Sequence, residues 1–465
     1  MYHQKRHIHF VGIGGIGMSG IAEILLNLGH GVSGSDLQSG AQTQRLQNMG
    51  AKIFLGHLES QVEHADVVVV SSAILEDNPE IQQARLQRIP VIPRAEMLAE
   101  LMRLKNSVAV AGSHGKTTTC SLLGTILTEG GLDPTLIIGG KVNNLGTNAR
   151  LGQGEFLVAE ADESDGSFLL LSPTVTVVTN IDREHMNYYR DLEHLKETFL
   201  TFINRVPFYG FSVLCLDDPE VQSLIPKIKK RYMTYGLSAQ SMMTARDITL
   251  TDWGFNFEVV FMGETLGRLE VNIPGRHNVL NSLAAITVAM EMGVKFDKIA
   301  KGISKLSGVG RRLEKKGEKQ GITFLDDYGH HPTEIRATLA ALAECYPERR
   351  KIVLFQPHRY TRTNDLFQEF LTSFNQADRL YLADIYPAGE KPQPGPDSRD
   401  SKDLAEAIRL YGHEGVTYVG NVNNFAGKVI KDLKAGDVVL TLGAGNIWEA
   451  GETLFKQLPV EQLRT

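Results

Sequence analysis

The chain has 465 residues, a length that suits about three domains of ordinary size. Its 42% hydrophobic and 22% charged residues make an ordinary globular composition, and the formal net charge of -6 argues against a protein that holds nucleic acid or an acidic membrane through a basic surface. The three cysteines lie far apart without zinc-ligand or redox-motif spacing, which predicts free thiols in a reducing compartment. Neither a signal peptide nor an 18-residue apolar run is found, so we expect a cytoplasmic protein that does not enter the membrane.

The first hundred residues alternate between predicted strands and helices. Strands are expected at 7–11, 31–36 and 65–71, with a helix at 18–28 between the first two. The strand at 65–71 is apolar without interruption, as is typical of a parallel sheet that is covered on both faces. This alternation predicts a Rossmann-like α/β domain over residues 1–105.

A polar break at Lys105 and Asn106 separates this domain from a second α/β region. There we expect strands at 107–111, 156–159 and 174–178, then an antiparallel flap over 247–273 with a turn at Gly263–Glu264, and a helix at 278–292. This pattern predicts a central α/β domain with a mixed sheet, spanning 106–310, and with the loop Ala-Gly-Ser-His-Gly-Lys-Thr-Thr-Thr at 111–119 it is expected to be an ATP-binding domain of the P-loop type.

A second break at 308–310 precedes the last predicted domain, a Rossmann-like α/β domain over 311–465. Its expected strands are 351–355, 379–383, 416–419 and 437–442, and the proline-rich segment 387–400 is expected to be a loop. The fold class is therefore α/β with three domains.

A phosphate-binding loop is predicted at 111–119, Ala-Gly-Ser-His-Gly-Lys-Thr-Thr-Thr, between a strand and a helix. Glycines let backbone N–H groups turn toward phosphate oxygens, and a helix N-terminus adds positive potential. Val110 stands where the general motif has its first glycine, but the strand–helix context favours a nucleotide site over a turn capped by threonines. The expected ATP-binding residues of this loop are Gly112, Ser113, His114, Gly115, Lys116, which would reach the outer phosphates, Thr117, whose hydroxyl can bind magnesium, and Thr118.

Two polar residues beyond this loop also follow predicted strands. Glu160 comes directly after the apolar run 156–159, where α/β sheets place functional groups, so a functional role is favoured over a solvated acidic loop. For Glu163 and Asp165 both interpretations stay open. His185 alone would be read as structural, but together with the phosphate loop and Glu160 it favours a magnesium ligand.

The N-terminal motif Gly-Ile-Gly-Gly-Ile-Gly at 12–17 predicts a second diphosphate site, with Asp36 at the distance of a ribose-binding acid. An NAD-dependent dehydrogenase would use this motif but would leave the loop at 111–119 unexplained. A nucleotide sugar would use the same glycines. A non-enzymatic nucleotide-binding regulator would need the phosphate loop but not the histidine and arginine clusters at 328–330 and 358–362.

Seven segments in this order resemble the Mur ligase family over essentially the whole chain: Gly-Ile-Gly-Gly-Ile-Gly-Met-Ser-Gly-Ile-Ala at 12–22, Ser-Gly-Ser-Asp at 33–36, the loop at 111–119, Ala-Glu-Ala-Asp-Glu-Ser-Asp at 159–165, Gly-Arg-His-Asn-Val-Leu-Asn at 275–281, Asp-Asp-Tyr-Gly-His-His-Pro at 326–332 and Phe-Gln-Pro-His-Arg-Tyr-Thr-Arg-Thr at 355–363. The resemblance implies an N-terminal domain for a UDP-sugar, a central domain for ATP and a C-terminal domain for an amino acid. Its implied activity is ATP-dependent joining of L-alanine to UDP-N-acetylmuramate through an acyl phosphate, in peptidoglycan synthesis.

The resemblance also implies the residues of each site. The UDP-sugar would be bound by Gly14, Gly15, Ser35, Asp36, His57, Ser71 and Arg94. Magnesium would be bound by Thr117, Glu160 and His185. Asn278 and Asn281 would face the adenine, Arg312 would assist catalysis and ATP binding, and the L-alanine pocket would hold Tyr328, His330, His358, Arg359 and Arg362. Catalysis would rest on Lys116, Glu160, His185, His330 and Arg312.

Several alternatives stay open within this resemblance. His330 is the candidate base for the amine, against a structural histidine paired with Asp327. A recycling ligase that adds a tripeptide to the same sugar is the close rival, and a folate-type glutamate ligase is a more distant one. Serine at 113 and glutamate at 184 depart from the family's usual threonine and aspartate. Sister ligases carry a carbamoylated lysine where this chain has Phe199, with Lys196 out of step, so none is expected. We expect a monomer or weak dimer.

Overall fold

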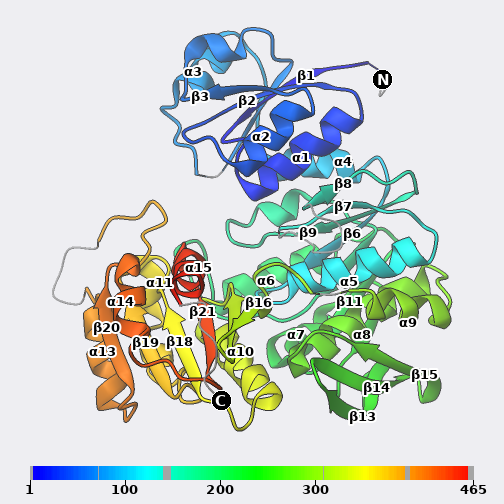
Figure 1. Cartoon of the computed structure of the whole chain (residues 1–465). Helices are drawn as coiled ribbons and strands as arrows, with labels where there is room; N and C mark the ends of the chain where they lie inside the picture. The colour runs from blue at the N-terminus through cyan, green and yellow to red at the C-terminus, as the bar shows by residue number, and fades with distance from the viewer. Residues whose placement is uncertain (1–3, 72, 140–147, 307, 393–397, 459–465) are drawn as a thin grey trace. The chain divides into compact units, whose positions relative to one another are not determined.

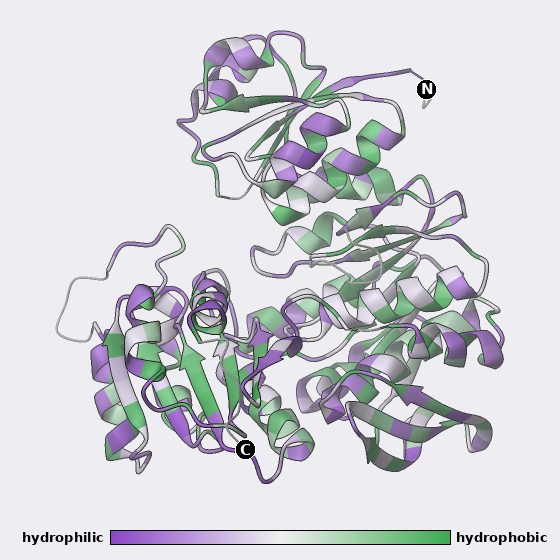
Figure 2. Cartoon of the chain, viewed as in Figure 1, coloured by the Kyte–Doolittle hydropathy of each residue, from purple (hydrophilic) through white to green (hydrophobic). Residues whose placement is uncertain are grey.

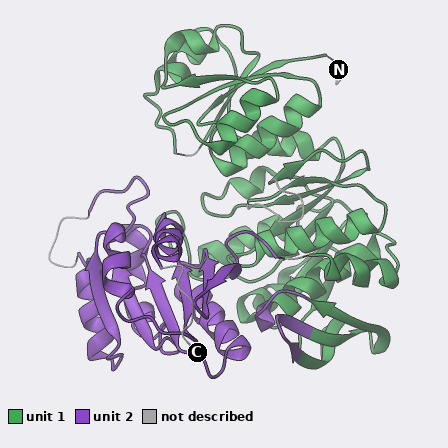
Figure 3. Ribbon diagram, viewed as in Figure 1, with its two compact units in different colours: residues 1–249, 256–271, 278–307 green, residues 250–255, 272–277, 308–465 purple. Residues whose placement is uncertain are grey.

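The computed structural model describes residues 4–71, 73–139, 148–306, 308–392 and 398–458 (Figure 1). The chain divides into two compact units (Figure 3). The first comprises residues 1–249, 256–271 and 278–307, and the second comprises 250–255, 272–277 and 308–465. Each unit is described by itself.

The N-terminal part of the first unit is a five-stranded parallel sheet in the order β3-β2-β1-β4-β5. In register, Val11 lies opposite Ser35 on one side and Val70 on the other, so the strands end at one edge of the sheet. Its elements are β1 (His7–Val11), α1 (Ile16–Asn27), β2 (Gly31–Asp36), α2 (Ala41–Asn48), β3 (Lys52–Leu55), η1 (Glu59–Val62), β4 (Val67–Val70), α3 (Pro79–Leu86), β5 (Val91–Pro93) and α4 (Arg94–Met102).

The central part of the chain, which belongs to the first unit apart from residues 250–255 and 272–277, is built on a ten-stranded sheet in the order β15-β14-β13-β12-β11-β10-β6-β9-β7-β8. The strands β6, β9 and β10 are parallel neighbours, whereas β7 and β8 pair antiparallel, so the sheet is mixed. Its elements are β6 (Asn106–Ala111), α5 (Lys116–Glu129), β7 (Thr135–Ile137), β8 (Ala149–Arg150), β9 (Phe156–Glu160), η2 (Ser167–Leu170), β10 (Val175–Val178), α6 (Leu192–Ile203), β11 (Phe211–Cys215), α7 (Pro219–Leu224), η3 (Ile225–Lys227), β12 (Tyr232–Tyr235), β13 (Met243–Thr251), β14 (Gly254–Phe261), β15 (Glu264–Val271), α8 (Arg276–Glu291) and α9 (Phe296–Ser304).

The predicted flap is the strand sequence β13-β14-β15. Two residues join β14 to β15, and because parallel strands need a much longer connection, these two strands are antiparallel. These two residues, Met262 and Gly263, have φ of 50° and 91°, as the type I′ hairpin turn requires at both central positions. The turn therefore lies one residue earlier than predicted.

The second unit contains a six-stranded sheet in the order β16-β17-β21-β18-β19-β20, parallel except for the hairpin β16–β17. The hairpin was not predicted, because its first strand is Glu-Lys-Lys-Gly-Glu-Lys and has no apolar face. Its elements are β16 (Glu314–Lys319), β17 (Ile322–Asp327), α10 (Pro332–Cys345), β18 (Lys351–Phe355), α11 (Tyr360–Asp365), α12 (Phe367–Phe370), β19 (Arg379–Ala383), α13 (Ser401–Leu410), β20 (Val416–Gly420), η4 (Val422–Asn424), α14 (Phe425–Val429), β21 (Val438–Leu442) and α15 (Ile447–Gln457).

The cores follow from the apolar strands. In the second unit β18 and β21 are buried at every position, and Figure 2 shows them as hydrophobic ribbons between helices of mixed colour. Such strands need cover on both faces, which the helices provide. Of the helices in the described residues, none is long and apolar enough to cross a membrane. The three-domain α/β fold class is confirmed, while the boundaries at 105 and 310 stay predictions.

Candidate functional site

The predicted phosphate loop connects β6 to α5. Gly112 and Gly115 have φ of 130° and 84°, a region that glycine alone enters without strain. Gly115 is the N-cap of α5 and has no side chain that could cap the helix, so the first N–H groups of α5 can face an anion. The loop thus has the backbone geometry of a phosphate cradle.

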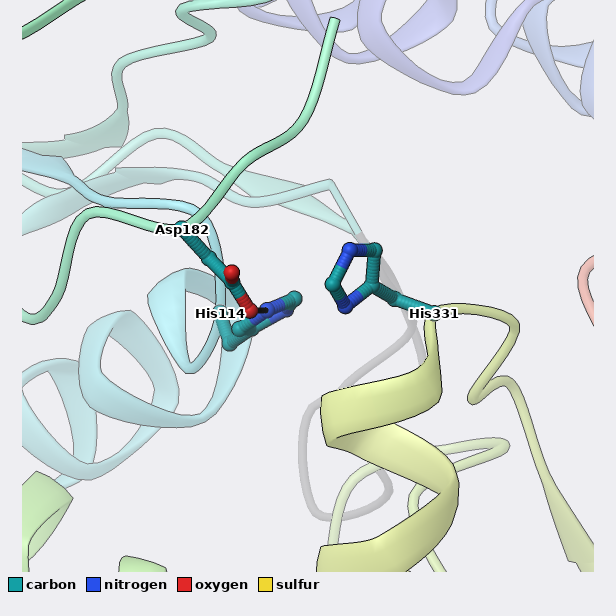
Figure 4. A group of neighbouring side chains, drawn as sticks. All are labelled: His114, Asp182 and His331. Carbon is teal, nitrogen blue, oxygen red and sulfur yellow. Dashed lines mark hydrogen bonds and ion pairs between the residues drawn. The ribbon is translucent and has the colours of Figure 1, made fainter. Parts of the chain in front are cut away.

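The loop is held by the segment that follows β10. His114 N donates to Asn180 Oδ1 at 2.8 Å, Thr179 Oγ1 donates to the His114 carbonyl at 2.6 Å, and Asp182 N donates to Ser113 Oγ at 2.8 Å. His114 Nε2 lies 3.0 Å from Asp182 Oδ2 (Figure 4). The carboxyl ends of β6 and β10 are in register, Ala111 opposite Val178, so the sheet itself brings the two segments together.

Lys116 begins α5 and is paired with a buried carboxylate. Its Nζ lies 2.9 Å from both carboxylate oxygens of Glu163 and also donates to the Gly112 carbonyl. Burial alone would lower the pKa of Lys116, but the charges of Glu163, Asp162 and Glu184 and the hydrogen bonds to Glu163 together outweigh burial, so the pKa is raised. Burial raises the pKa of Glu163 to about 7 in spite of the lysine. The ammonium group therefore stays charged at neutral pH.

Three side chains beside Lys116 have the chemistry of a cation site. Glu163, Glu184 and His185 each place a ligand atom within 4.8 Å of the others. His185 Nε2 is 3.8 Å from Glu163 Oε1 and 3.7 Å from Glu184 Oε2. His185 has φ of 59°, a strained value that clusters at functional sites. Carboxylate oxygens are the ligands that magnesium prefers, so the donor set fits that ion.

The predicted magnesium ligand Glu160 lies at the end of β9, opposite Val110 of β6. Its Oε1 accepts a hydrogen bond from Gly139 N at 2.7 Å, and it is not a member of the group formed by Glu163, Glu184 and His185. Thr117 is buried in the first turn of α5. The roles of Glu160, His185 and Thr117 as ligands stay predictions.

The two asparagines of α8 lie against the N-terminus of α5. Asn281 Oδ1 accepts from Thr119 Oγ1 at 3.3 Å, and Asn281 Nδ2 donates to Asn278 Oδ1 at 2.9 Å. A Cβ on Gly115 would lie 2.6 Å from Asn281 Oδ1. The structure thus brings the predicted adenine-facing residues to the phosphate loop.

Asp36 holds the N-terminal glycine motif at 12–17, since Asp36 Oδ2 accepts a hydrogen bond from Gly14 N at 2.8 Å. Ser71 lies beside the motif, since a Cβ on Gly12 would be 3.3 Å from the Ser71 Cβ. Arg94, the first residue of α4, packs against Gly17 and reaches Asp162 Oδ2 at 3.1 Å. The residues predicted for a UDP-sugar therefore gather at the carboxyl edge of the first sheet.

The residues predicted for the amino acid gather in the second unit. Asp327, Leu442 and Phe355 are in register at the ends of β17, β21 and β18, so Tyr328 and His358 follow the two strands that flank β21. The ring of His330 is 5.4 Å from that of Tyr328 and 5.8 Å from that of His358. Aromatic rings and imidazoles therefore line one edge of this sheet.

Four arginines surround these rings. The guanidinium groups of Arg311 and Arg312 lie 5.1 and 5.3 Å from the Tyr328 ring centroid, and Arg362 Nη1 is 3.2 Å from His358 Nδ1. Arg359 has φ of 72°, and its Nη1 lies 3.8 Å from Glu390 Oε1. The cluster suits the carboxylate of an amino acid, which arginine binds through two parallel hydrogen bonds.

The two histidines of this cluster differ in their surroundings. Burial, followed by the charges of His330 and the arginines, lowers the pKa of His358 to about 3, so His358 stays neutral. His330 Nδ1 lies 3.1 Å from the Tyr328 carbonyl and 3.4 Å from Glu334. Asp327 instead accepts from the backbone of Leu313 and Gly329. His331 caps α10 (Figure 4).

Sequence reasoning did not identify three acids of these sites. Glu163 was left open, although it follows Glu160 in the same segment. Glu390 lies in the predicted proline-rich loop, yet it accepts from Thr361 N at 3.1 Å and from Thr361 Oγ1 at 2.7 Å. Glu80 lies on α3 and is fully buried against the first sheet. No local motif marks such residues, because their partners are distant in sequence.

The fold and these sites define a three-part α/β protein with a predicted phosphate-binding loop in its central sheet and predicted sites for a diphosphate and a carboxylate at the edges of the other two sheets. Family models match nearly the whole chain: the Mur ligase family catalytic domain over 7–106, the Mur ligase middle domain over 110–289 and the Mur ligase glutamate ligase domain over 311–445. The chain belongs to the Mur ligase family.

Within the family, the chain is similar to the following individual proteins. UDP-N-acetylmuramate–L-alanine ligases of Geobacter sp. (strain M21) and Trichlorobacter lovleyi are each 56% identical over 98% of this chain and cover 99% and 100% of their own lengths. A crystal structure of UDP-N-acetylmuramate–alanine ligase from Thermotoga maritima has a TM-score of 0.82 at 27% identity, over 97% of this chain and 99% of that one. A murein peptide ligase from Psychrobacter arcticus has a TM-score of 0.71 at 25% identity, over 97% and 98%.

Proposed function

We propose that the chain is the cytoplasmic ATP-dependent ligase that joins L-alanine to UDP-N-acetylmuramate in peptidoglycan synthesis. The observation that carries the proposal is 56% identity to ligases of that name over 98% of the chain. The buried Lys116 at the start of α5 supports ATP as the second substrate. The tripeptide-adding alternative has weaker support, since the murein peptide ligase is the less similar of the two solved structures.

The proposed reaction has two steps. The carboxylate of UDP-N-acetylmuramate attacks the γ-phosphorus of ATP, which breaks the bond to ADP and gives an acyl phosphate. The amine of L-alanine, freed of a proton by His330, then attacks the acyl carbon, phosphate leaves and an amide remains. Phosphoryl transfer requires mainly positioning and charge neutralisation, for which Lys116 supplies a fixed positive charge.

Magnesium is the second proposed cofactor. Its proposed holders are Thr117, Glu160 and His185, with Glu163 and Glu184 added from the geometry around His185. When bound, the ion would neutralise charge on the phosphate oxygens. The carboxylates beside Lys116 fit this role because the cation would offset their mutual repulsion.

The remaining predicted residues keep their proposed roles. The edge at Gly14, Gly15, Ser35, Asp36, His57, Ser71 and Arg94 would bind the UDP-sugar. Asn278, Asn281 and Arg312 would serve ATP, and Tyr328, His330, His358, Arg359 and Arg362 would bind L-alanine. Lys196 Nζ lies 2.9 Å from both Glu193 Oε1 and Glu220 Oε2, and the proposal includes no carbamoylated lysine. Domains at 1–105, 106–310 and 311–465 and a monomer or weak dimer complete the proposal.

The test is phosphate release from ATP in the presence of UDP-N-acetylmuramate, with L-alanine, the tripeptide or no amine. Release that requires both the sugar and L-alanine, and that stops with EDTA and returns with magnesium, supports the proposal. Lys116→Ala is the catalytic control. Preference for the tripeptide would assign the chain to recycling, and NAD binding without phosphate release would restore the dehydrogenase.

A further inference from the structure

One face of the first sheet carries a buried hydrogen-bonded network instead of apolar side chains. His7 and His9 of β1 and Ser33 and Ser35 of β2 alternate along neighbouring strands, with His9 opposite Ser33. Glu80 of α3 covers them, and both His9 and Glu80 are completely buried. Parallel strands usually bury aliphatic side chains on such a face, so this polar set needs a reason.

Glu80 is the centre of the network. Its Oε1 lies 3.1 Å from His9 Nε2, and its Oε2 lies 2.7 Å from Ser35 Oγ and 2.8 Å from His57 Nδ1. Burial alone would raise the pKa of Glu80, but hydrogen bonds from His9, Ser35 and His57 outweigh burial and hold the pKa below its usual value. Glu80 is therefore ionised at neutral pH.

Because Glu80 is ionised, its hydrogen-bond partners must be donors. An ionised carboxylate accepts hydrogen bonds and donates none, so His9 Nε2, Ser35 Oγ and His57 Nδ1 must all carry the proton. A neutral His57 with its proton on Nδ1 has its lone pair on Nε2. Among the described residues, no hydrogen-bond partner of His57 Nε2 is found.

The position of His57 connects this network to the nucleotide edge. His57 comes two residues after the end of β3, while Ser35 and Asp36 end β2 and the glycine motif follows β1. Because Asp36 lies opposite Leu55 in register, all these ends lie at one edge of the sheet. The diphosphate belongs at the end of β1 and the ribose at the end of β2 in this type of sheet, so the outer strand faces the nucleoside.

We propose that Glu80 is a positioning residue for the UDP-sugar: through His57 Nδ1 it fixes the tautomer in which His57 Nε2 accepts a hydrogen bond from the nucleoside. This inference rests on the proposed function. A uridine nucleotide offers donors of the required kind in its ring N–H and ribose hydroxyl groups. Removal of a carboxylate that orients a metal-binding histidine typically lowers affinity or activity by about 10- to 100-fold, and we take the same range for a carboxylate that orients a substrate-binding histidine.

The first experiment compares Glu80→Gln with the wild type in the phosphate-release assay. The amide can donate to His57 Nδ1 and so favours the opposite tautomer. We expect KM for UDP-N-acetylmuramate to rise about 10- to 100-fold, with KM for ATP and L-alanine and kcat nearly unchanged. The matched control is Glu76→Gln, whose carboxylate pairs with Arg85 on the surface and should leave all constants unchanged.

A double-mutant cycle separates positioning from a general loss of structure. If Glu80 acts through His57, Glu80→Gln adds little to the KM of His57→Gln. Independent, additive effects of the two substitutions would overturn the proposal. Glu80→Asp, which keeps the charge, should recover part of the affinity, and no recovery would also count against it.

A spectroscopic measurement on the unmodified protein does not depend on how variants fold. The imidazole ¹⁵N signals of His57, assigned by their loss in His57→Gln, should show the proton on Nδ1 at neutral pH. A proton on Nε2 would overturn the inference. A wild-type protein without sugar-dependent phosphate release would instead refute the proposed function, because the tautomer can be read without catalysis.

Discussion

The substitution Gly115→Ala tests whether the phosphate loop and α8 form one nucleotide site. Gly115 has φ of 84°, and an alanine there adopts the left-handed conformation at a cost of about 1–2 kcal/mol. The new Cβ would lie 2.6 Å from Asn281 Oδ1. Asn281 is buried and bonded to Asn278 and Thr119, so its displacement adds about 1–3 kcal/mol.

The chain offers a matched control at the other end of α5. Gly131 has φ of 80°, and a Cβ there meets no atom of the described residues within 4 Å. Gly131→Ala therefore imposes similar backbone strain without the clash, and the change in unfolded-state entropy is common to both substitutions. The difference between the two variants isolates the contact with Asn281.

The assay is urea unfolding together with the KM for ATP. Gly115→Ala should lose about 1–3 kcal/mol more stability than Gly131→Ala. Its KM for ATP should rise about tenfold or more, which corresponds to about 1.4 kcal/mol of lost binding, while Gly131→Ala should keep the wild-type KM. Equal stability and equal KM values in the two variants would refute the reasoning.

Three other predictions test the remaining electrostatics. Lys116→Ala should lower the rate of phosphate release about 100-fold or more, and should lower the free energy of unfolding by about 3–5 kcal/mol because Glu163 is left buried without its partner. Adding Glu163→Gln should restore stability in urea but not activity, and restored activity would contradict the role of Lys116. Burial raises the pKa of Asp327 from 3.8 to about 6, so the folded state binds this proton more tightly than the unfolded state. About 3 kcal/mol of stability is therefore present below pH about 4 and is lost as the pH rises to about 6. The difference in unfolding free energy between wild type and Asp327→Asn should follow that course, and a difference independent of pH would refute it. Since the pKa of His358 is lowered to about 3, His358 does not change its charge between pH 5 and 8, so the shape of the kcat–pH profile in that range should be the same in His358→Gln as in the wild type; a changed shape would refute the reasoning.

The sequence by itself determined the elements whose signal is local. The apolar run before Gly112 and the Gly-Lys-Thr core specify a strand, a turn and a helix through backbone preferences of neighbouring residues, and the structure has β6 ending at Ala111 and α5 beginning at Lys116. The N-terminal glycine motif and Asp36 are specified in the same way, since Asp36 closes the loop onto Gly14. Because parallel strands end at one edge, their order in the chain also indicated which polar residues would gather.

Tertiary structure alone decided the partners of the buried acids. Glu163 and Glu160 are three residues apart in one acidic segment, yet Glu163 pairs with Lys116 and Glu160 accepts from Gly139. Glu80 reads as an ordinary helix residue in sequence, and its burial against His9 and His57 follows from how α3 packs on the sheet. A carboxylate's role depends on the charges and donors that folding brings within about 3 Å of it, and those come from residues distant in the chain.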